Sequence, residues 1–219
     1  MSENLNFQTF FLYNSFTLQK NSAYMTIKSG KAPYISPEEL NHTLNAQSGK
    51  HKLRNQVILL VSHFLGLRAK ELASLKVSDL YDLNRQVLKD TIRLVAAYTK
   101  GGKFREVYLV DPTLKELILK YLLNERSPLS PSEALFRSQK GLGFTADTMQ
   151  KLLKNCYKKA GIVASSHTGR RSFATNLIDN GADIYSIKLL MGHSTIETTQ
   201  EYFSSNPNKL KEQLLKLNQ

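Results

Sequence analysis

The chain has 219 residues, 41% of them hydrophobic, so it can bury a core without disulfides. Lysine and arginine number 30 against 18 acidic residues, and the net charge of +12 suits a nucleic-acid partner or, less well, an anionic membrane surface. With Cys156 as the only cysteine, an intrachain disulfide scaffold and a cysteine-ligated structural zinc are excluded. No apolar run reaches the ~20 residues of a membrane span, and the N-terminus lacks the features of a signal peptide. We therefore expect a cytoplasmic protein that works beside nucleic acid.

The first part of the chain predicts an extension followed by helices. Residues 1–35 are rich in Asn, Ser, Thr and aromatic residues without a helical period, which indicates an N-terminal arm. Helical signals begin at Ser36, where serine, proline and glutamate form a capping box for a helix over 37–46. Further helices are expected over 53–65 and 69–75.

The middle of the chain is richer in β-forming residues. Two such runs, 91–95 and 106–110, flank the turn Lys-Gly-Gly-Lys and predict a β-hairpin. A helix then follows Asp111-Pro112, and a loop rich in Ser and Pro leads to a short expected strand over 135–137.

The last third is predicted to be helical again. Helices are expected over 145–160, 170–180 and 184–191, each followed directly by a glycine. A capping box at Ser194 predicts the start of another helix that extends toward 203. The tail, 204–219, carries an amphipathic helix. The predicted fold class is α+β, mainly α, a helical bundle with a small antiparallel sheet. We expect an arm over 1–35, a main domain over 36–203 and the C-terminal helix over 204–219.

Several polar side chains at the ends of these elements suit phosphoryl transfer. Arginines can clamp the charge that spreads over phosphate oxygens in the pentavalent state. A lysine on a hairpin can protonate a leaving oxygen, and a tyrosine can attack phosphorus. The candidates are Arg68, Lys100, His167, Arg170, His193 and Tyr202.

Their order along the chain resembles the motif order of the tyrosine recombinase (phage integrase) family. The resemblance covers about 37–203 and rests on GLRAKEL from Gly66, TKGGKFR from Thr99, HTGR from His167, LMGHS from Leu190, and Tyr202 after two threonines. It implies that family's catalytic-domain fold and a site-specific DNA recombinase, an integrase or invertase.

The resemblance also implies a role for each motif residue. Tyr202 would attack the scissile phosphate to form a 3′-phosphotyrosyl link, while Lys100 would protonate the 5′-oxygen leaving group. Arg68 and Arg170 would hold the non-bridging oxygens. The DNA would be cut and rejoined without metal, ATP or any other cofactor.

Supporting roles follow in the same way. His167 would act as a general acid/base, His193 would donate a hydrogen bond to the phosphate, and Glu71 would orient Arg68. Double-stranded DNA is the expected partner, together with further copies of the chain as a dimer or tetramer on DNA. Basic residues expected at the DNA are Lys103, Arg105, Arg171, Lys151 and Lys154.

Three departures from the family pattern stand out. Gly169 replaces a common leucine and is expected to loosen a helix start, and Arg171 replaces a common histidine. The residues before Pro37 are too few for the family's separate helical DNA-clamping domain. We therefore expect weak, salt-dependent DNA binding or dependence on a DNA-bending accessory protein. In size the chain is similar to the small recombinases that invert fimbrial promoters.

Other interpretations remain open at this stage. Taken singly, Arg68 with Glu71 could be an exposed ion pair, Lys100 a solvated turn residue, and Tyr202 a core residue. Two alternative functions are a catalytically weak DNA-binding regulator of the same fold and a type IB-like topoisomerase. The presence of all six candidates favours the recombinase over the regulator.

Overall fold

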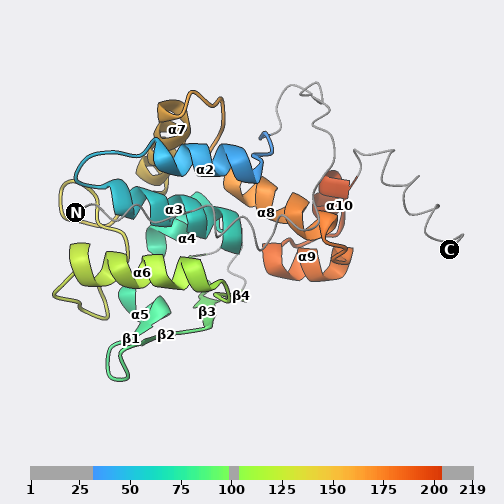
Figure 1. The fold of residues 1–219 in the computed structure, drawn as a ribbon. Coiled ribbons are helices and arrows are strands. Elements are labelled where there is room, and N and C mark those ends of the chain that lie inside the picture. Colours follow the sequence, from blue (N-terminus) through green and yellow to red (C-terminus); the bar gives the residue numbers. More distant parts are fainter. Residues whose placement is uncertain (1–31, 99–103, 204–219) are drawn as a thin grey trace, which may run out of the picture.

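The computed structural model describes residues 32–98 and 104–203. The expectations for the N-terminal arm over 1–31, for Lys100 and Lys103, and for the tail over 204–219 lie outside the described residues. The described part is built mainly from helices, with two antiparallel pairs of short strands (Figure 1). The expected fold class is therefore confirmed.

Helix α3, Lys52–Leu65, lies at the centre of the larger part of the molecule (Figure 1). It is buried along nearly its whole length, because apolar residues occupy almost every side of it. It ends as expected at Gly66, whose φ of 59° is a conformation that glycine adopts without strain. The helices that pack on α3 are α4 (Ala69–Ser74), α6 (Pro112–Glu125), α7 (Ala146–Lys159) and α8 (Thr168–Asp179).

The expected start of the first described helix is confirmed. Helix α2, Pro37–Asn45, begins with the capping box in which Ser36 and Glu39 bond to each other's backbone N–H groups. Helix α2 packs against α7, and this contact holds the first described helix on the bundle.

The expected hairpin is also present. Strand β3, Thr91–Leu94, pairs antiparallel with β4, Arg105–Tyr108, and Ile92 and Leu94 face the core. The sequence analysis missed three short elements that precede the hairpin, α5 (Val77–Leu80), β1 (Tyr81–Asp82) and β2 (Val87–Leu88). The strand expected over 135–137 is not formed: isolated bridges pair Lys76 with Ala134 and Arg137 with Gly143.

A smaller group of helices completes the described chain. Helices α9 (Ile184–Met191) and α10 (Glu197–Phe203) pack on each other and on α8, at the right-hand end in Figure 1. Helix α9 ends at Gly192 with a φ of 60°, again as its sequence indicates. Cys156 is buried in the larger core. Over the described residues, no helix is both long enough and apolar enough to cross a membrane.

Candidate active site

Arg68 and Glu71 form a partly buried pair at the start of α4. The Arg68 backbone N–H donates to Glu71 Oε2 at 2.7 Å, and its Nη1 donates to Oε1 at 3.0 Å. The Glu71 side chain is 0% exposed. The alternative of an exposed surface pair is therefore excluded, and a buried charge of this kind needs its partners.

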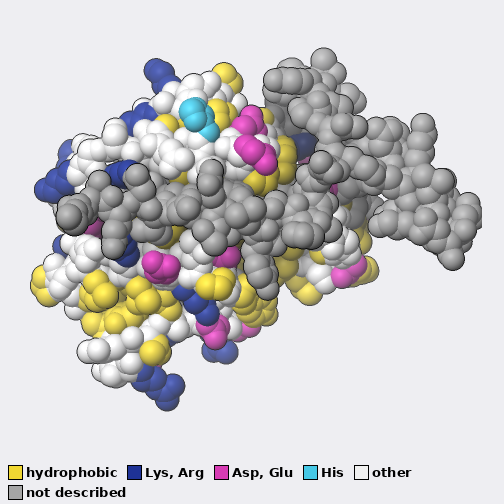
Figure 2. All heavy atoms as spheres, viewed as in Figure 1, with side chains coloured by type: hydrophobic (Ala, Val, Ile, Leu, Met, Phe, Trp, Pro, Cys, Tyr) yellow, Lys and Arg dark blue, Asp and Glu magenta, His cyan; other side chains and the backbone are white. Residues whose placement is uncertain are grey.

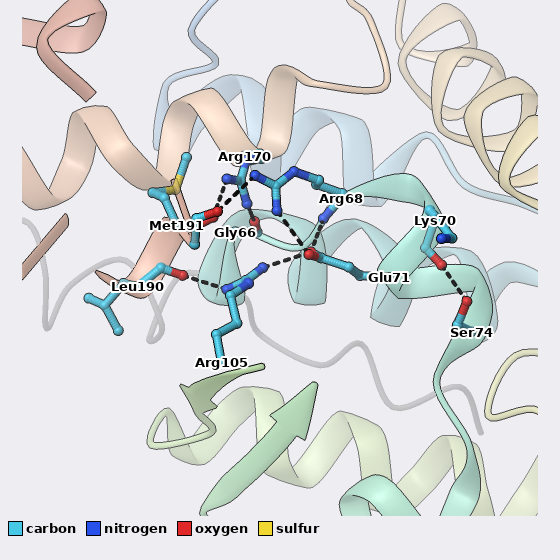
Figure 3. A network of polar contacts seen from close by, with 10 residues as sticks. Gly66, Arg68, Lys70, Glu71, Ser74, Arg105, Arg170, Leu190 and Met191 are labelled. Atoms are coloured by element: carbon cyan, nitrogen blue, oxygen red, sulfur yellow. Dashed lines mark hydrogen bonds and ion pairs between the residues drawn. The ribbon is translucent and has the colours of Figure 1, made fainter. Parts of the chain in front are cut away.

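Arg105 is the second partner of Glu71. Its Nη2 lies 2.6 Å from Glu71 Oε2, and the Arg105 side chain is 6% exposed (Figure 3). Burial pushes the pKa of the Glu71 carboxyl upward, but the charge of Arg105 and hydrogen bonds from Arg68 and Arg105 hold this pKa below its ordinary value. Glu71 is therefore a carboxylate shared by two arginines.

The last turn of α9 accepts three arginines on three consecutive carbonyls. Arg105 donates to Leu190 O and Arg170 to Met191 O (Figure 3). Arg68 donates through Nη2 to Gly192 O at 3.3 Å. Carbonyls at a helix C-terminus lack partners within the helix and lie at the negative end of its dipole, so this turn suits cations.

Arg170 is the most deeply buried of these three cations. It is 4% exposed, and its Nη1 donates to Gly66 O at 2.7 Å, which ties α8 to the end of α3. Burial, together with the charges of Arg68 and Arg105, lowers the pKa of Arg170 to about 9. Arg170 thus stays protonated at neutral pH, in a positive field that an anion would relieve.

His193 follows the three carbonyls and is linked to α10. Its Nδ1 lies 2.9 Å from Oγ1 of Thr199, which is fully buried. Burial, then Arg170, Arg68 and Arg105, lower the pKa of His193 to about 4, so the ring is neutral at pH 7. A neutral ring has one donor and one acceptor nitrogen, so Nε2 can donate to a ligand when Nδ1 accepts from Thr199.

Tyr202 lies on α10, and its ring faces the ring of His193. The two rings are stacked with centroids 6.0 Å apart and an angle of 5° between their planes. The Arg171 guanidinium lies 5.9 Å from the Tyr202 centroid, within the range of a cation–π contact. These contacts hold the ring of the candidate nucleophile from two neighbouring elements.

His167 precedes the first turn of α8, close to Arg170. Burial lowers the pKa of His167, and the charges of Arg170, Arg68 and Lys154 lower it further. A cleft of about 580 Å³ is lined by His167, Arg170 and Tyr202, with Arg171 and the chain before α2 along its walls. Three of the six candidates, His167, Arg170 and Tyr202, thus line one cleft, His193 stacks on Tyr202, and the charge of Arg68 acts on both Arg170 and His193.

The residues expected at the DNA are placed less uniformly. Lys151 and Lys154 lie on the exposed side of α7, where Lys151 pairs with Asp147 at 2.8 Å. Arg105 differs from the expectation, because its guanidinium is turned inward to Glu71 and Leu190 and not onto the surface. On the face seen in Figure 2, Lys and Arg side chains lie in several separate places, with Asp and Glu between them.

Sequence reasoning missed two contributions to the site. Thr199 was noted only as part of a motif, although its hydroxyl contacts His193. The inward role of Arg105 had no signal beyond its place at the end of the hairpin motif. In the ranges 32–98 and 104–203, no three His, Cys, Asp or Glu side chains gather as a metal site would require.

The chain as a whole is similar to known proteins. Residues 33–209 match the model of the Phage integrase family, and the chain belongs to this family. The relatives include the "Tyrosine recombinase XerD" of Oceanobacillus iheyensis, 36% identical over 193 residues, which cover 84% of this chain and 62% of that protein. The "Tyrosine recombinase XerA" of Pyrococcus furiosus is 34% identical over 77% of this chain and 56% of its own length.

Solved structures agree with this assignment. A crystal structure of XerA recombinase is similar with a TM-score of 0.69 and 29% identity, covering 85% of this chain and 65% of that one. A post-cleavage complex of XerH recombinase with a difH substrate has a TM-score of 0.67 and 25% identity, covering 89% and 56%. The chain thus spans about three fifths of the length of the relatives it matches.

Proposed function

We propose that this chain is a site-specific tyrosine recombinase that cuts and rejoins double-stranded DNA through a phosphotyrosyl intermediate. The observation that carries the proposal is the cleft at which Tyr202, Arg170 and His167 meet, with His193 stacked on Tyr202 and Arg68 bonded to the carbonyl of Gly192 beside it. The names of the XerD and XerA relatives support the same activity. The catalytic domain extends over 36–203 in this proposal.

The chemistry starts from a phosphodiester placed in the cleft. The Tyr202 hydroxyl oxygen forms a bond to phosphorus while the bond to the 5′-oxygen breaks, which leaves a 3′-phosphotyrosyl link. His167 takes the tyrosine proton. Lys100, whose role rests on its motif because it lies outside the described residues, gives a proton to the 5′-oxygen. Attack by a 5′-hydroxyl from another strand reverses the step and restores the DNA backbone.

The charges of the site suit this pathway. Arg68 and Arg105 share the buried carboxylate of Glu71, and Arg170 lies within reach of its charge, so the three guanidinium groups and one carboxylate together carry two net positive charges. The pentavalent state carries one more negative charge than the diester, so it gains more from this field than the ground state does. His193 adds a neutral donor through Nε2 when Thr199 donates to Nδ1.

DNA is the proposed partner, and recombination needs several protomers on it. The XerH structure is a complex with its difH substrate, which supports a similar use of the cleft here. We propose that protomers pair as dimers or tetramers through the amphipathic tail over 204–219, in the cytoplasm and beside the nucleoid. A DNA-bending protein assists where binding by this chain alone is weak.

Covalent trapping tests the function directly. Wild-type protein and Tyr202→Phe are incubated with fragmented genomic DNA from the source organism and denatured. DNA that remains bound to protein is then sequenced. We expect adducts at a few defined sequences with the wild type and none with Tyr202→Phe. Specific binding on a native gel without any adduct would contradict the proposal and favour the DNA-binding regulator.

A second measurement separates recombinase from topoisomerase. Two copies of the recovered sequence are placed on one plasmid, and the products are resolved after incubation with the wild type. Exchange between the two copies, absent when one copy is scrambled, is expected for a recombinase. Relaxation of supercoils without exchange would favour the topoisomerase instead.

A further inference from the structure

Arg105 is buried in the site, and its low exposure does not suit direct contact with DNA. It is the first residue of β4, it is 7% exposed, and its guanidinium joins Glu71 on α4 to the Leu190 carbonyl on α9. Two elements that are far apart in the sequence therefore meet on one side chain (Figure 3).

The absence of a side chain at Gly192 leaves space for Arg105. A Cβ atom at position 192 would lie 2.4 Å from Cδ and 2.9 Å from Nε of Arg105, closer than real contacts allow. Gly192 also has a φ of 60°, which L-residues with side chains rarely adopt. The glycine before His193 thus ends α9 and at the same time leaves room for Arg105.

The contacts of Arg105 parallel those of the two arginines proposed to hold phosphate. Arg105 and Arg68 both bind Glu71, and Arg105, Arg170 and Arg68 bind the successive carbonyls of Leu190, Met191 and Gly192. Arg105 uses both terminal nitrogens on these protein partners. Its buried Nε has no hydrogen-bond partner among the described residues. Because both terminal nitrogens of Arg105 bond to protein atoms, Arg105 holds in place Glu71 and the end of α9, which are also partners of Arg68 and Arg170.

We propose that Arg105 is a positioning residue for the strand-cleavage reaction: it braces Glu71 against the last turn of α9 and so sets the distance between Arg68, Arg170 and His193. The inference deepens the proposed function and rests on it. Lysine cannot replace the arginine, because one ammonium group lacks the planar fork that reaches a carboxylate and a carbonyl together. A small displacement of catalytic groups is enough to slow a reaction strongly.

The test compares Arg105→Lys and Arg105→Gln with a matched control on the same hairpin. Arg93→Gln removes the same charge from β3, where the Arg93 side chain is 73% exposed and pairs with Glu106 at 3.0 Å. Single-turnover cleavage and DNA affinity are measured on a duplex recovered by covalent trapping. We expect cleavage to slow by about 100-fold in both Arg105 variants. DNA affinity and its salt dependence should stay unchanged, and Arg93→Gln should cleave at the wild-type rate.

A neutral substrate separates positioning of the charged groups from simple support of the fold. In a methylphosphonate, one charged non-bridging oxygen at the cleaved position is replaced by a methyl group, so less charge needs stabilisation. The defect of Arg105→Gln should shrink on this substrate if Arg105 acts by setting Arg68 and Arg170. An equal defect on both substrates would overturn the proposal.

Other outcomes also decide the matter. Weaker DNA binding with a salt slope lowered by about 0.9 would make Arg105 a phosphate contact and refute the positioning role. Loss of a cooperative thermal transition in both Arg105 variants would make it a folding residue and likewise refute it. If the wild type, Arg93→Gln and Arg105→Gln all cleave at the same rate, only the inference about Arg105 fails. If the wild type forms no adduct at all, the proposed function fails with it.

Discussion

The candidate nucleophile and the arginine frame rest on two very different cores. Arg68 and Glu71 lie at the start of α4, whose Ala69 and Leu72 belong to the large cluster around α3 that contains most of the buried apolar residues of the described chain. Tyr202 packs on a small cluster in which Ala174, Ile187 and Met191 are the fully buried members. Arg68, which we propose to hold phosphate, therefore lies beside the larger core, and Tyr202, the proposed nucleophile, lies on the smaller one.

Arginine hydrogen bonds link these two parts in addition to the packing of α8 on α3. The last turn of α9 belongs to the small cluster, yet its carbonyls accept Arg105 from β4 and Arg68 from the start of α4. Arg170 adds a bond from α8 to the end of α3 through Gly66 O. Because few apolar residues stabilise α9 and α10, we infer that these helices open more readily than α3. The arginine contacts then join the end of α9, which precedes the Tyr202 helix, to the rest of the site.

Truncation in each cluster tests this difference most strongly. Leu59→Ala removes a side chain that is 0% exposed in the large cluster, and we expect a loss of about 2–5 kcal/mol in the free energy of unfolding. Met191→Ala, equally buried in the small cluster, should instead speed amide exchange over 184–203 and leave α3 protected. Denaturant melts and hydrogen exchange measure both effects. Equal losses of protection in α3 would show that the two clusters unfold as one unit.

Gly169 lies at the contact between α3 and α8, where the two parts of the molecule meet. A Cβ there would lie 2.3 Å from Ser62 Oγ and 2.9 Å from Ser62 Cβ, so the glycine lets the helices approach closely. The expectation of a loosened helix start does not describe this position, since α8 begins at Thr168 and Gly169 is buried in its first turn. We expect Gly169→Ala to destabilise the fold by about 1–3 kcal/mol in thermal melts, because it overpacks this contact.

A second substitution controls for the intrinsic effect of alanine. Ser62→Ala removes the hydroxyl nearest to the added methyl group, so the double variant should recover part of the stability lost in Gly169→Ala. Additive losses in the double variant would mean that the close approach is not the cause.

We also expect the stability of the larger part of the molecule to depend on pH, because His63 is buried there. This residue is buried on α3, its Nε2 lies 2.9 Å from the Tyr157 hydroxyl, and burial lowers its pKa from 6.5 to about 3. Below pH 6.5 the unfolded chain takes up a proton that the folded protein excludes. Stability should therefore fall between pH 6.5 and 3, by at most about 1.4 kcal/mol per pH unit. Denaturant melts of His63→Gln should show a flatter dependence between pH 6.5 and 5, and an unchanged slope would contradict this.

Local signals were enough to predict most of the fold. The box at Ser36, the glycines at 66 and 192, and the β-rich runs on either side of the hairpin turn each act over a few residues, and the structure places helix or strand ends there. The missed elements, such as α5 and β1, are too short to carry a periodic pattern. The strand expected over 135–137 depended on a partner strand that the fold does not supply.

The sequence by itself determined the family, the candidate side chains and their order, because motif residues and caps are properties of short segments. Only the tertiary structure decided how the charges meet. Glu71 is three residues from Arg68 but 34 from Arg105, and no pattern in the chain shows that both share its carboxylate. The inward turn of Arg105 and the tight contact at Gly169 arise from helices brought together by burial, which depends on the whole core and not on neighbouring residues.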